Sequence, residues 1–283
     1  MEGALLAPPA VAAALDEQQA RPLGAAPAAG EDPDSIIVTG IPDAKREERK
    51  RAAEFVRRAG VAQLEPVARW IAPVCPRTLG VAAKIAGIVD DRIREVATAA
   101  GAPVAPTPCT PNIAVIFTDN GDGLTRAILD KSPRLAASLS STERERLVQG
   151  DGPIRWWYGT RDESRDGMPT TDGILKQYNS SIVSTQVVRA LRSATVIVDA
   201  EQADGTLLDA VASYTAMVAL AELNSDPPPP KDSIMGLFGD EPEHRSLSGK
   251  DMALLRGIYS LPPDREAYQH RRRLVGAVRK GEE

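Results

Sequence analysis

Histidine and cysteine are scarce in this sequence, and their scarcity limits the chemistry that it can support. Among 283 residues there are two histidines, His244 and His270, and two cysteines, Cys75 and Cys109. The histidines belong to no H-E-x-x-H motif, and no C-x-x-C pair accompanies them. A catalytic zinc ion normally takes three protein ligands. No metal site is therefore predicted, and we expect both histidines on the surface.

Motifs of catalysis and cofactor binding are also missing. The sequence contains no G-x-S-x-G, no S-x-x-K and no glycine-rich phosphate-binding loop. The segment TDNGDG (residues 118–123) does not follow the ligand spacing of a calcium loop. A serine nucleophile needs a histidine base, and both histidines stand in polar stretches. The sequence therefore predicts no catalytic, cofactor-binding or metal-binding residue.

Long apolar runs and large basic patches are missing as well. Beyond the N-terminus no stretch reaches the ~20 apolar residues that a membrane span needs. The net charge is -5, whereas nucleic-acid binding needs a concentrated positive surface. The basic residues in 45–58 alternate with glutamates, as on a solvated helix face. We expect neither a membrane span nor a nucleic-acid partner.

The two cysteines favour a disulfide. Cys75 and Cys109 each stand next to proline, and their separation suits a bond that closes a long loop, worth roughly 3–4 kcal/mol. Two unrelated buried thiols are the alternative. A structural disulfide persists in an oxidising compartment, so the pair favours a periplasmic or secreted protein.

The N-terminus points the same way. Residues 1–14 are apolar and end in small residues, as the remnant of a signal peptide would, although Glu2 is acidic and no basic residue precedes the stretch. A disordered Ala/Pro-rich tail is the alternative. Residues 15–42 are rich in Ala, Pro, Gly and acidic residues, which predicts disorder. Within them IIVTG (residues 36–40) could add as a strand to a sheet edge, and residues 43–283 are expected to form a single globular domain.

Apolar periodicity divides residues 43–283 into helical and extended stretches. Helices are predicted over residues 43–59, 79–100, 124–129, 140–148, 207–223, 250–259 and 264–280. A strand is predicted over 112–119, another within 153–164 that leads into a polar loop, and two more around a bend in 180–199, the second at 194–199. Capping boxes are predicted at Thr142 with Glu145, Thr206 with Asp209, and Ser248 with Asp251. Because the strands and helices do not alternate strictly, we expect an α+β fold with a mixed sheet packed against helices.

Aromatic residues make up only 4% of the chain, yet Trp156, Trp157 and Tyr158 are consecutive. Side chains alternate along a strand, so Trp156 is expected to share a face with Ile154 and Tyr158, with Trp157 on the opposite face. One interpretation places one tryptophan in the core and the other under a helix or loop. The second interpretation makes these aromatic residues the wall of a ligand groove.

A polar stretch completes this predicted groove. Ser181, Ser184 and Thr185 belong to NSSIVSTQ (residues 179–186). A strand of this composition could pair with an extended peptide by strand addition. The groove hypothesis therefore joins the WWY segment to this second stretch.

Two resemblances extend this interpretation. The runs CPRTLGV, CTPNIAVIFTDNG, PIRWWYGT and SSIVSTQVVRALRSATVIVD resemble an uncharacterised family of exported alphaproteobacterial proteins, over residues 36–276. The later runs YTAMVALAEL, DSIMGLF and LSGKDMALLRGIY are similar in layout to zincin-like metallopeptidase domains. That resemblance places Tyr214 and Val218 at the two metal-binding histidine positions and Thr215 at the glutamate position. Since none of these side chains can replace the originals, it implies a degenerate zincin-like layout without metal ligands.

These observations together predict an exported, non-catalytic module that binds a peptide or an envelope protein. Two alternatives stay open. One is a periplasmic hydrolase, directed at glycans or peptides, that uses carboxylates such as Asp162, Glu163 and Asp166 without a metal. The other is an envelope scaffold. The IIVTG segment also resembles a stretch near the N-terminus of TonB-dependent outer-membrane receptors, which implies a shared periplasmic partner.

Overall fold

Four parallel strands and one antiparallel strand form the sheet around which the helices pack. The strands are β1 (Arg69–Trp70), β2 (Pro76–Leu79), β3 (Ile113–Thr118), β4 (Ile154–Ser164) and β5 (Val187–Asp199). The order is β1-β5-β3-β2, and β4 pairs antiparallel with β5. Because β4 follows one edge of β5 over nearly its whole length, β1 and β3 share the other edge. Within the part of the chain that the structure describes, β4 is thus an edge strand.

The computed structural model describes residues 43–62, 64–131, 139–150, 152–164, 187–240, 242–263 and 265–281. The predicted signal-peptide remnant (1–14) and tail (15–42), with its IIVTG segment, lie outside these ranges. The described residues all fall in one unit that begins at residue 42. Their helices are α1 (Asp43–Arg58), α2 (Ala83–Ala100), α3 (Gly121–Lys131), α4 (Ser141–Gln149), α5 (Leu208–Leu220), the 3₁₀ helix η1 (Ile234–Gly236), α6 (Gly249–Ser260) and α7 (Ala267–Lys280).

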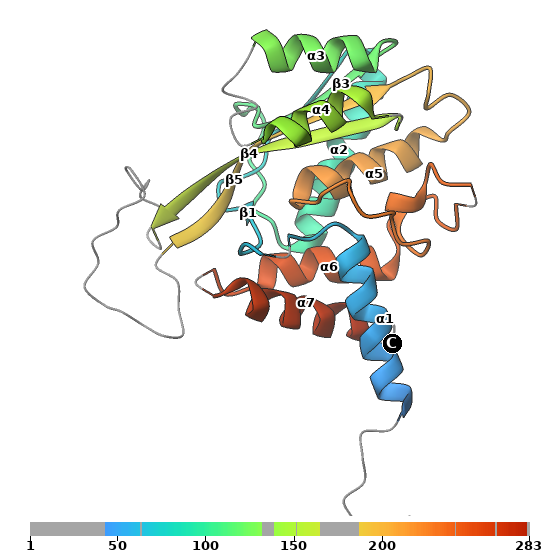
Figure 1. Cartoon of the computed structure of the whole chain (residues 1–283). Helices are drawn as coiled ribbons and strands as arrows, with labels where there is room; N and C mark the ends of the chain where they lie inside the picture. The colour runs from blue at the N-terminus through green and yellow to red at the C-terminus, as the bar shows by residue number, and fades with distance from the viewer. Residues whose placement is uncertain are drawn as a thin grey trace, which may run out of the picture. The chain divides into compact units, whose positions relative to one another are not determined.

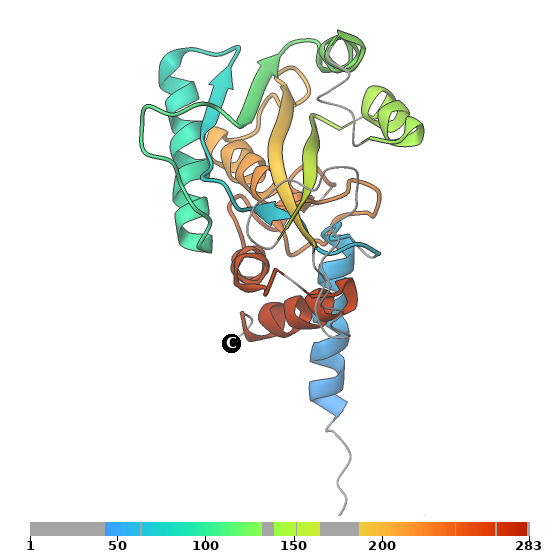
Figure 2. The ribbon, with the colours of Figure 1, turned by 90° about the vertical axis from the view of Figure 1, so that its left-hand side faces the viewer.

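Helices cover both faces of the sheet (Figures 1 and 2). On one face α2 and α5 pack together against the sheet, and their apolar side chains belong to the larger of two buried clusters. On the other face α3 and α4 enclose a smaller cluster around Leu129, Trp157 and Ile197. Helices α1, α6 and α7 pack against one another beyond the sheet. The predicted α+β fold with a mixed sheet packed against helices is confirmed.

The β2–α2–β3 segment shows what the sequence revealed and what it did not. The apolar stripe of α2 is buried, and Gly101 ends the helix in the left-handed conformation (φ 85°), as glycine does at many helix ends. The predicted helix start at residue 79 is wrong, because residues 76–79 form β2. This strand alternates buried and exposed residues and pairs with β3 along its length. Four residues with proline and arginine gave no strand signal of their own.

Strand β5 is continuous over its 13 described residues, so the bend predicted within 180–199 does not fall there. The irregularity lies in β4 instead, where the register shifts between Gly159 and Thr160. Such a bulge lets a long strand pair curve while both strands stay hydrogen-bonded.

Of the three predicted capping boxes, one is present at the predicted residues. The capping box at Ser248 and Asp251 is confirmed, and the buried Asp251 carboxylate also accepts hydrogen bonds from Ser233 Oγ (2.6 Å) and the Ile234 N–H (2.9 Å). The box predicted at Thr142 and Glu145 is instead formed by Ser140 and Glu143, two residues earlier. The box predicted at Thr206 and Asp209 is wrong, because Leu207 is the N-cap and makes no side-chain bond.

The predicted disulfide between Cys75 and Cys109 is present. It fastens the segment between α2 and β3 to the residue that precedes β2. Asn112 supports the same junction, since its side-chain oxygen accepts a hydrogen bond from the Cys75 N–H at 2.7 Å. None of the helices in the described ranges combines the length and apolarity needed to cross a bilayer.

The prediction that both histidines lie on the surface is wrong for His270, which is 2% exposed. Its Nδ1 accepts a hydrogen bond from the Val67 N–H at 3.2 Å, and its Nε2 lies 2.8 Å from the carbonyl oxygen of Pro262. The neutral ring with its proton on Nε2 satisfies both contacts. His270 therefore joins α7 to two loops inside the fold, where polar neighbours in the sequence gave no sign of burial.

Candidate functional site

One edge of the β4 backbone faces away from β5. Asp199 donates its N–H to the carbonyl of Pro153 at 2.8 Å, which fixes the hydrogen-bonding phase of the β4–β5 pair. Hydrogen-bonded and non-hydrogen-bonded pairs alternate along antiparallel strands. The N–H and C=O groups of Ile154, Trp156 and Tyr158 therefore point away from β5, toward the outer edge.

A cavity of about 740 Å³ runs beside this edge. Ile154, Arg155 and Trp156 all line it, although neighbouring side chains in a strand point to opposite faces. A cavity that is lined by side chains from both faces of β4 must run along the edge of that strand. Its other lining residues come from the ends of α1 and α4, from α5 and η1, and from the segment after α5: Arg58, Arg146, Leu147, Gln149, Gly150, Gly152, Tyr214, Asn224, Ser225, Asp226, Pro227, Pro229 and Met235.

A second cavity of about 110 Å³ continues along the same edge. Trp156, Trp157 and Tyr158 line it, together with Glu143 of α4 and Glu222 at the end of α5. The two cavities share six lining residues, namely Arg146, Leu147, Trp156, Asn224, Ser225 and Asp226. We call the two together the β4-edge groove, with α4 as one wall and residues 222–229 as the other.

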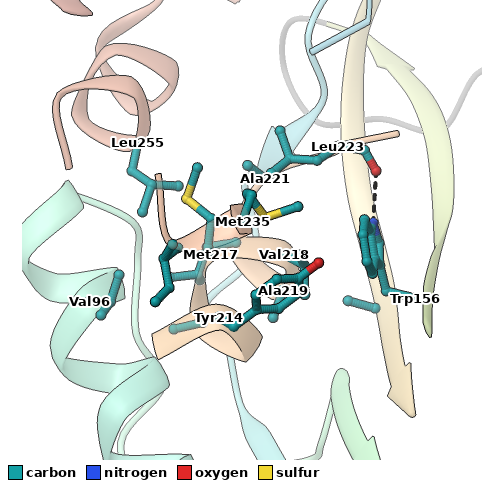
Figure 3. Packing of buried hydrophobic residues seen from close by; sticks show 14 of the residues in the cluster. Val96, Trp156, Tyr214, Met217, Val218, Ala219, Ala221, Leu223, Met235 and Leu255 are labelled. Atoms are coloured by element: carbon teal, nitrogen blue, oxygen red, sulfur yellow. Dashed lines mark hydrogen bonds between the residues drawn. The ribbon is translucent and has the colours of Figure 1, made fainter. Parts of the chain in front are cut away.

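Trp156 is held in place by the chain that follows α5. Its indole Nε1–H donates to the carbonyl oxygen of Leu223 at 2.8 Å (Figure 3). The ring also meets the Tyr214 ring edge to face, with centroids 6.0 Å apart. Trp156 is 8% exposed, so most of the ring belongs to the core and only its margin reaches the groove.

Tyr158 is anchored in the same way, one step further along β4. Its hydroxyl lies 2.7 Å from the carbonyl oxygens of both Val218 and Ala221, and it accepts a hydrogen bond from the Leu223 N–H at 3.2 Å. These are end-of-helix carbonyls that would otherwise lack partners. Burial raises the pKa of Tyr158 well above its ordinary value, so the hydroxyl stays protonated and remains a donor.

Trp157 lies on the opposite face, as the alternation predicted, and packs under α3 and α4. It is 2% exposed, and its Nε1–H has no hydrogen-bond partner among the described residues. Both tryptophans are therefore buried, and both also line the groove. The predicted partners Ser181, Ser184 and Thr185 lie outside the described residues.

The positions that the sequence resemblance assigned to a zincin metal helix lie on α5, which is buried on all sides from Ala210 to Leu220. Thr215 and Val218 are fully buried, while Tyr214 lines the larger cavity. The Thr215 hydroxyl has no hydrogen-bond partner in the described ranges. A search of these ranges for three or more His, Cys, Asp or Glu side chains placed to hold a metal ion finds no such group.

The carboxylates considered for hydrolysis do not face one another. Asp162 and Glu163 are neighbours in β4, so their side chains point to opposite faces of the strand. Asp162 is exposed, whereas Glu163 is 1% exposed and forms an ion pair with Arg192. Asp166 lies outside the described residues. Hydrolysis of this kind needs two carboxyl groups that flank the same substrate bond. The side chains of Asp162 and Glu163 are not placed in that way.

A partly buried ionic cluster lies at the end of the groove. Arg189 pairs with both Glu222 and Glu65, the latter at 2.9 Å. Burial raises the pKa of Glu222; Arg189 opposes this shift and the nearby Glu65 charge adds to it. The sequence gave no indication of this cluster or of the groove walls, because their residues are separated by long stretches of chain.

Comparison with known proteins provides no counterpart for this site. No protein-family model matches the chain, no curated protein matches it, and no solved structure matches it at a significant level.

Proposed function

We propose that this protein is an exported, non-catalytic module that binds an extended peptide or protein segment by strand addition to β4. The observation that carries the proposal is the outer edge of β4, where Ile154 and Trp156 present N–H and C=O groups beside a groove. In strand addition the backbone bonds supply affinity, and pockets for alternate side chains supply specificity. The β4-edge groove offers both.

The rigidity of this edge supports the proposal. Hydrogen bonds to the chain at the end of α5 hold the Trp156 and Tyr158 side chains in place. These two side chains are therefore already ordered in the free protein. Binding to a preorganised edge avoids much of the entropy cost of immobilising side chains, about 0.5–1.5 kcal/mol for each flexible one.

Export and the degenerate zincin-like layout are parts of the same proposal. The disulfide between Cys75 and Cys109 supports export, because such bonds persist in oxidising compartments. The full burial of Thr215 and Val218 is consistent with a helix that serves packing alone. Cell fractionation tests the export claim, and mature protein found in the cytosol would contradict it; alkylation of the unreduced periplasmic protein tests the disulfide separately.

Amide hydrogen exchange tests strand addition directly, with β4 as its own control. In the free protein the amides of Ile154 and Trp156 should exchange faster than those of Arg155 and Trp157, which bond to β5. Peptides selected from a random 12-residue displayed library should slow only the first group. Slow exchange of all four amides in the free protein, or no slowing with any selected peptide, would overturn the proposal.

A further inference from the structure

The larger cavity of the β4-edge groove carries more positive than negative charge among the described residues. Arg58, Arg146 and Arg155 line the larger cavity, against one acidic residue, Asp226. Arg155 is already engaged, since its guanidinium contacts Asp122 and donates to the Gly150 carbonyl at 2.6 Å. Arg146 pairs with Asp226. Arg58 donates to the Pro228 carbonyl at 3.0 Å and forms no ion pair within the described ranges, so it contributes an uncompensated charge.

The Arg146–Asp226 ion pair crosses the groove. Arg146 belongs to α4, which is one wall, and Asp226 belongs to residues 222–229, which form the other. Both side chains are about half exposed, at 50% and 53%. An exposed ion pair of this kind contributes little stability, so a competing carboxylate can replace Asp226 at small cost.

The same cavity has an apolar side next to these charges. Trp156 and Tyr214 meet there, and Met235 and Pro229 complete the surface. A segment lying along β4 would place one of its side chains against these rings and another near Arg146, because side chains in the added strand alternate between faces.

We infer that the groove binds an extended segment with one apolar and one acidic side chain. In the free protein the Asp226 carboxylate occupies the position beside Arg146 that the ligand carboxylate takes on binding. This inference rests on the proposed function. Arg146 gives up Asp226 and binds the incoming carboxylate, and Arg58 adds attraction that Asp226 does not neutralise. Arginine suits this role because its planar guanidinium can hold a carboxylate with two hydrogen bonds.

Peptides selected from the random 12-residue library provide the probe, each compared with a copy in which Asp or Glu is replaced by the amide. The acidic form should bind about tenfold more tightly, as expected for a hydrogen bond to a charged group. Asp226→Asn should strengthen binding of the acidic form, and Arg146→Gln and Arg58→Gln should weaken it. Arg57→Gln is the matched control, because Arg57 is exposed, pairs with Glu54 and does not line the groove.

The outcomes separate this inference from the proposed function. If selected peptides slow exchange of the β4 edge amides but their amide copies bind equally well, or if Asp226→Asn leaves affinity unchanged, the acidic ligand is excluded and strand addition stands. If no selected peptide engages the edge, both proposals fail. If the protein itself dimerises through β4 and excludes every peptide, a second copy is the occupant and the inference is overturned. Unchanged thermal unfolding of the arginine variants confirms that any loss of binding is local.

Discussion

Trp156 of β4 and Tyr214 of α5 meet edge to face, with ring centroids 6.0 Å apart and planes inclined by 68°. This contact joins the edge strand to the buried helix α5. Aromatic pairs in this geometry are worth about 0.5–1.5 kcal/mol beyond the area they bury. Tyr214 thus stabilises the position of Trp156, which lines the β4-edge groove.

The two adjacent tryptophans should respond differently to the same substitution. Trp156→Phe removes the donor to Leu223 and leaves a buried carbonyl unpaired, whereas Trp157→Phe removes an N–H that has no partner among the described residues. Both lose similar packing. We expect Trp156→Phe to lower the free energy of unfolding by about 1–3 kcal/mol more than Trp157→Phe. Urea unfolding of the pair measures this difference, and equal losses would contradict the assigned bonds.

Removal of the disulfide should destabilise the protein substantially. The bond spans a sequence separation of 34 residues, and a loop of this size predicts a loss of roughly 3–4 kcal/mol in the free energy of unfolding. Cys75→Ala with Cys109→Ala should reproduce the effect of reductant on the wild type, and reductant should not change the double variant further. A double variant as stable as the oxidised protein would show that the bond does not constrain the unfolded chain.

A methyl group at Gly121 should disturb the packing of two buried charged side chains at the start of α3. An added Cβ there would lie 2.5 Å from Arg155 Nη1 and 2.8 Å from Asp199 Oδ2, and both side chains are 4% exposed. Gly121→Ala should cost about 1–3 kcal/mol. Gly87→Ala in α2 is the control, because no atom lies within 4 Å of its added Cβ, and alanine should stabilise the helix by up to about 1 kcal/mol. Thermal unfolding compares the two, and a neutral Gly121→Ala would contradict this packing.

Glu222 should make stability decrease as pH rises. Burial raises its pKa above the ordinary value of 4.5, so the folded state binds the Glu222 proton more tightly than the unfolded state does. Above pH 4.5 the unfolded state releases this proton first, and the free energy of unfolding falls until the pH passes the raised pKa.

The variant Glu222→Gln should lack this decrease when unfolding is followed across the same pH range. Glu54→Gln is the comparison, since the hydrogen bond from Arg57 lowers the pKa of the exposed Glu54, and this change should not flatten the curve. Superimposable curves for wild type and Glu222→Gln would exclude the assigned shift.

Residues close together in the sequence were sufficient to predict those features that depend on contacts within one segment. The helical character of α2, its end before Gly101 and the capping box of Ser248 with Asp251 were all predicted from neighbouring residues. The opposite faces of Trp156 and Trp157 followed from strand alternation. Strand β2 and the buried His270 were missed, because β2 depends on pairing with β3 and His270 on partners at Val67 and Pro262.

The amino-acid sequence by itself determined the long helices and the long strands, the disulfide partners and the shortage of side chains for metal or histidine chemistry. Only the tertiary structure decided that β4 is an edge strand and that Arg58, Arg146 and Asp226 gather beside it. The physical reason is that periodicity and capping act over a few residues, whereas the groove requires four distant segments to pack around one strand.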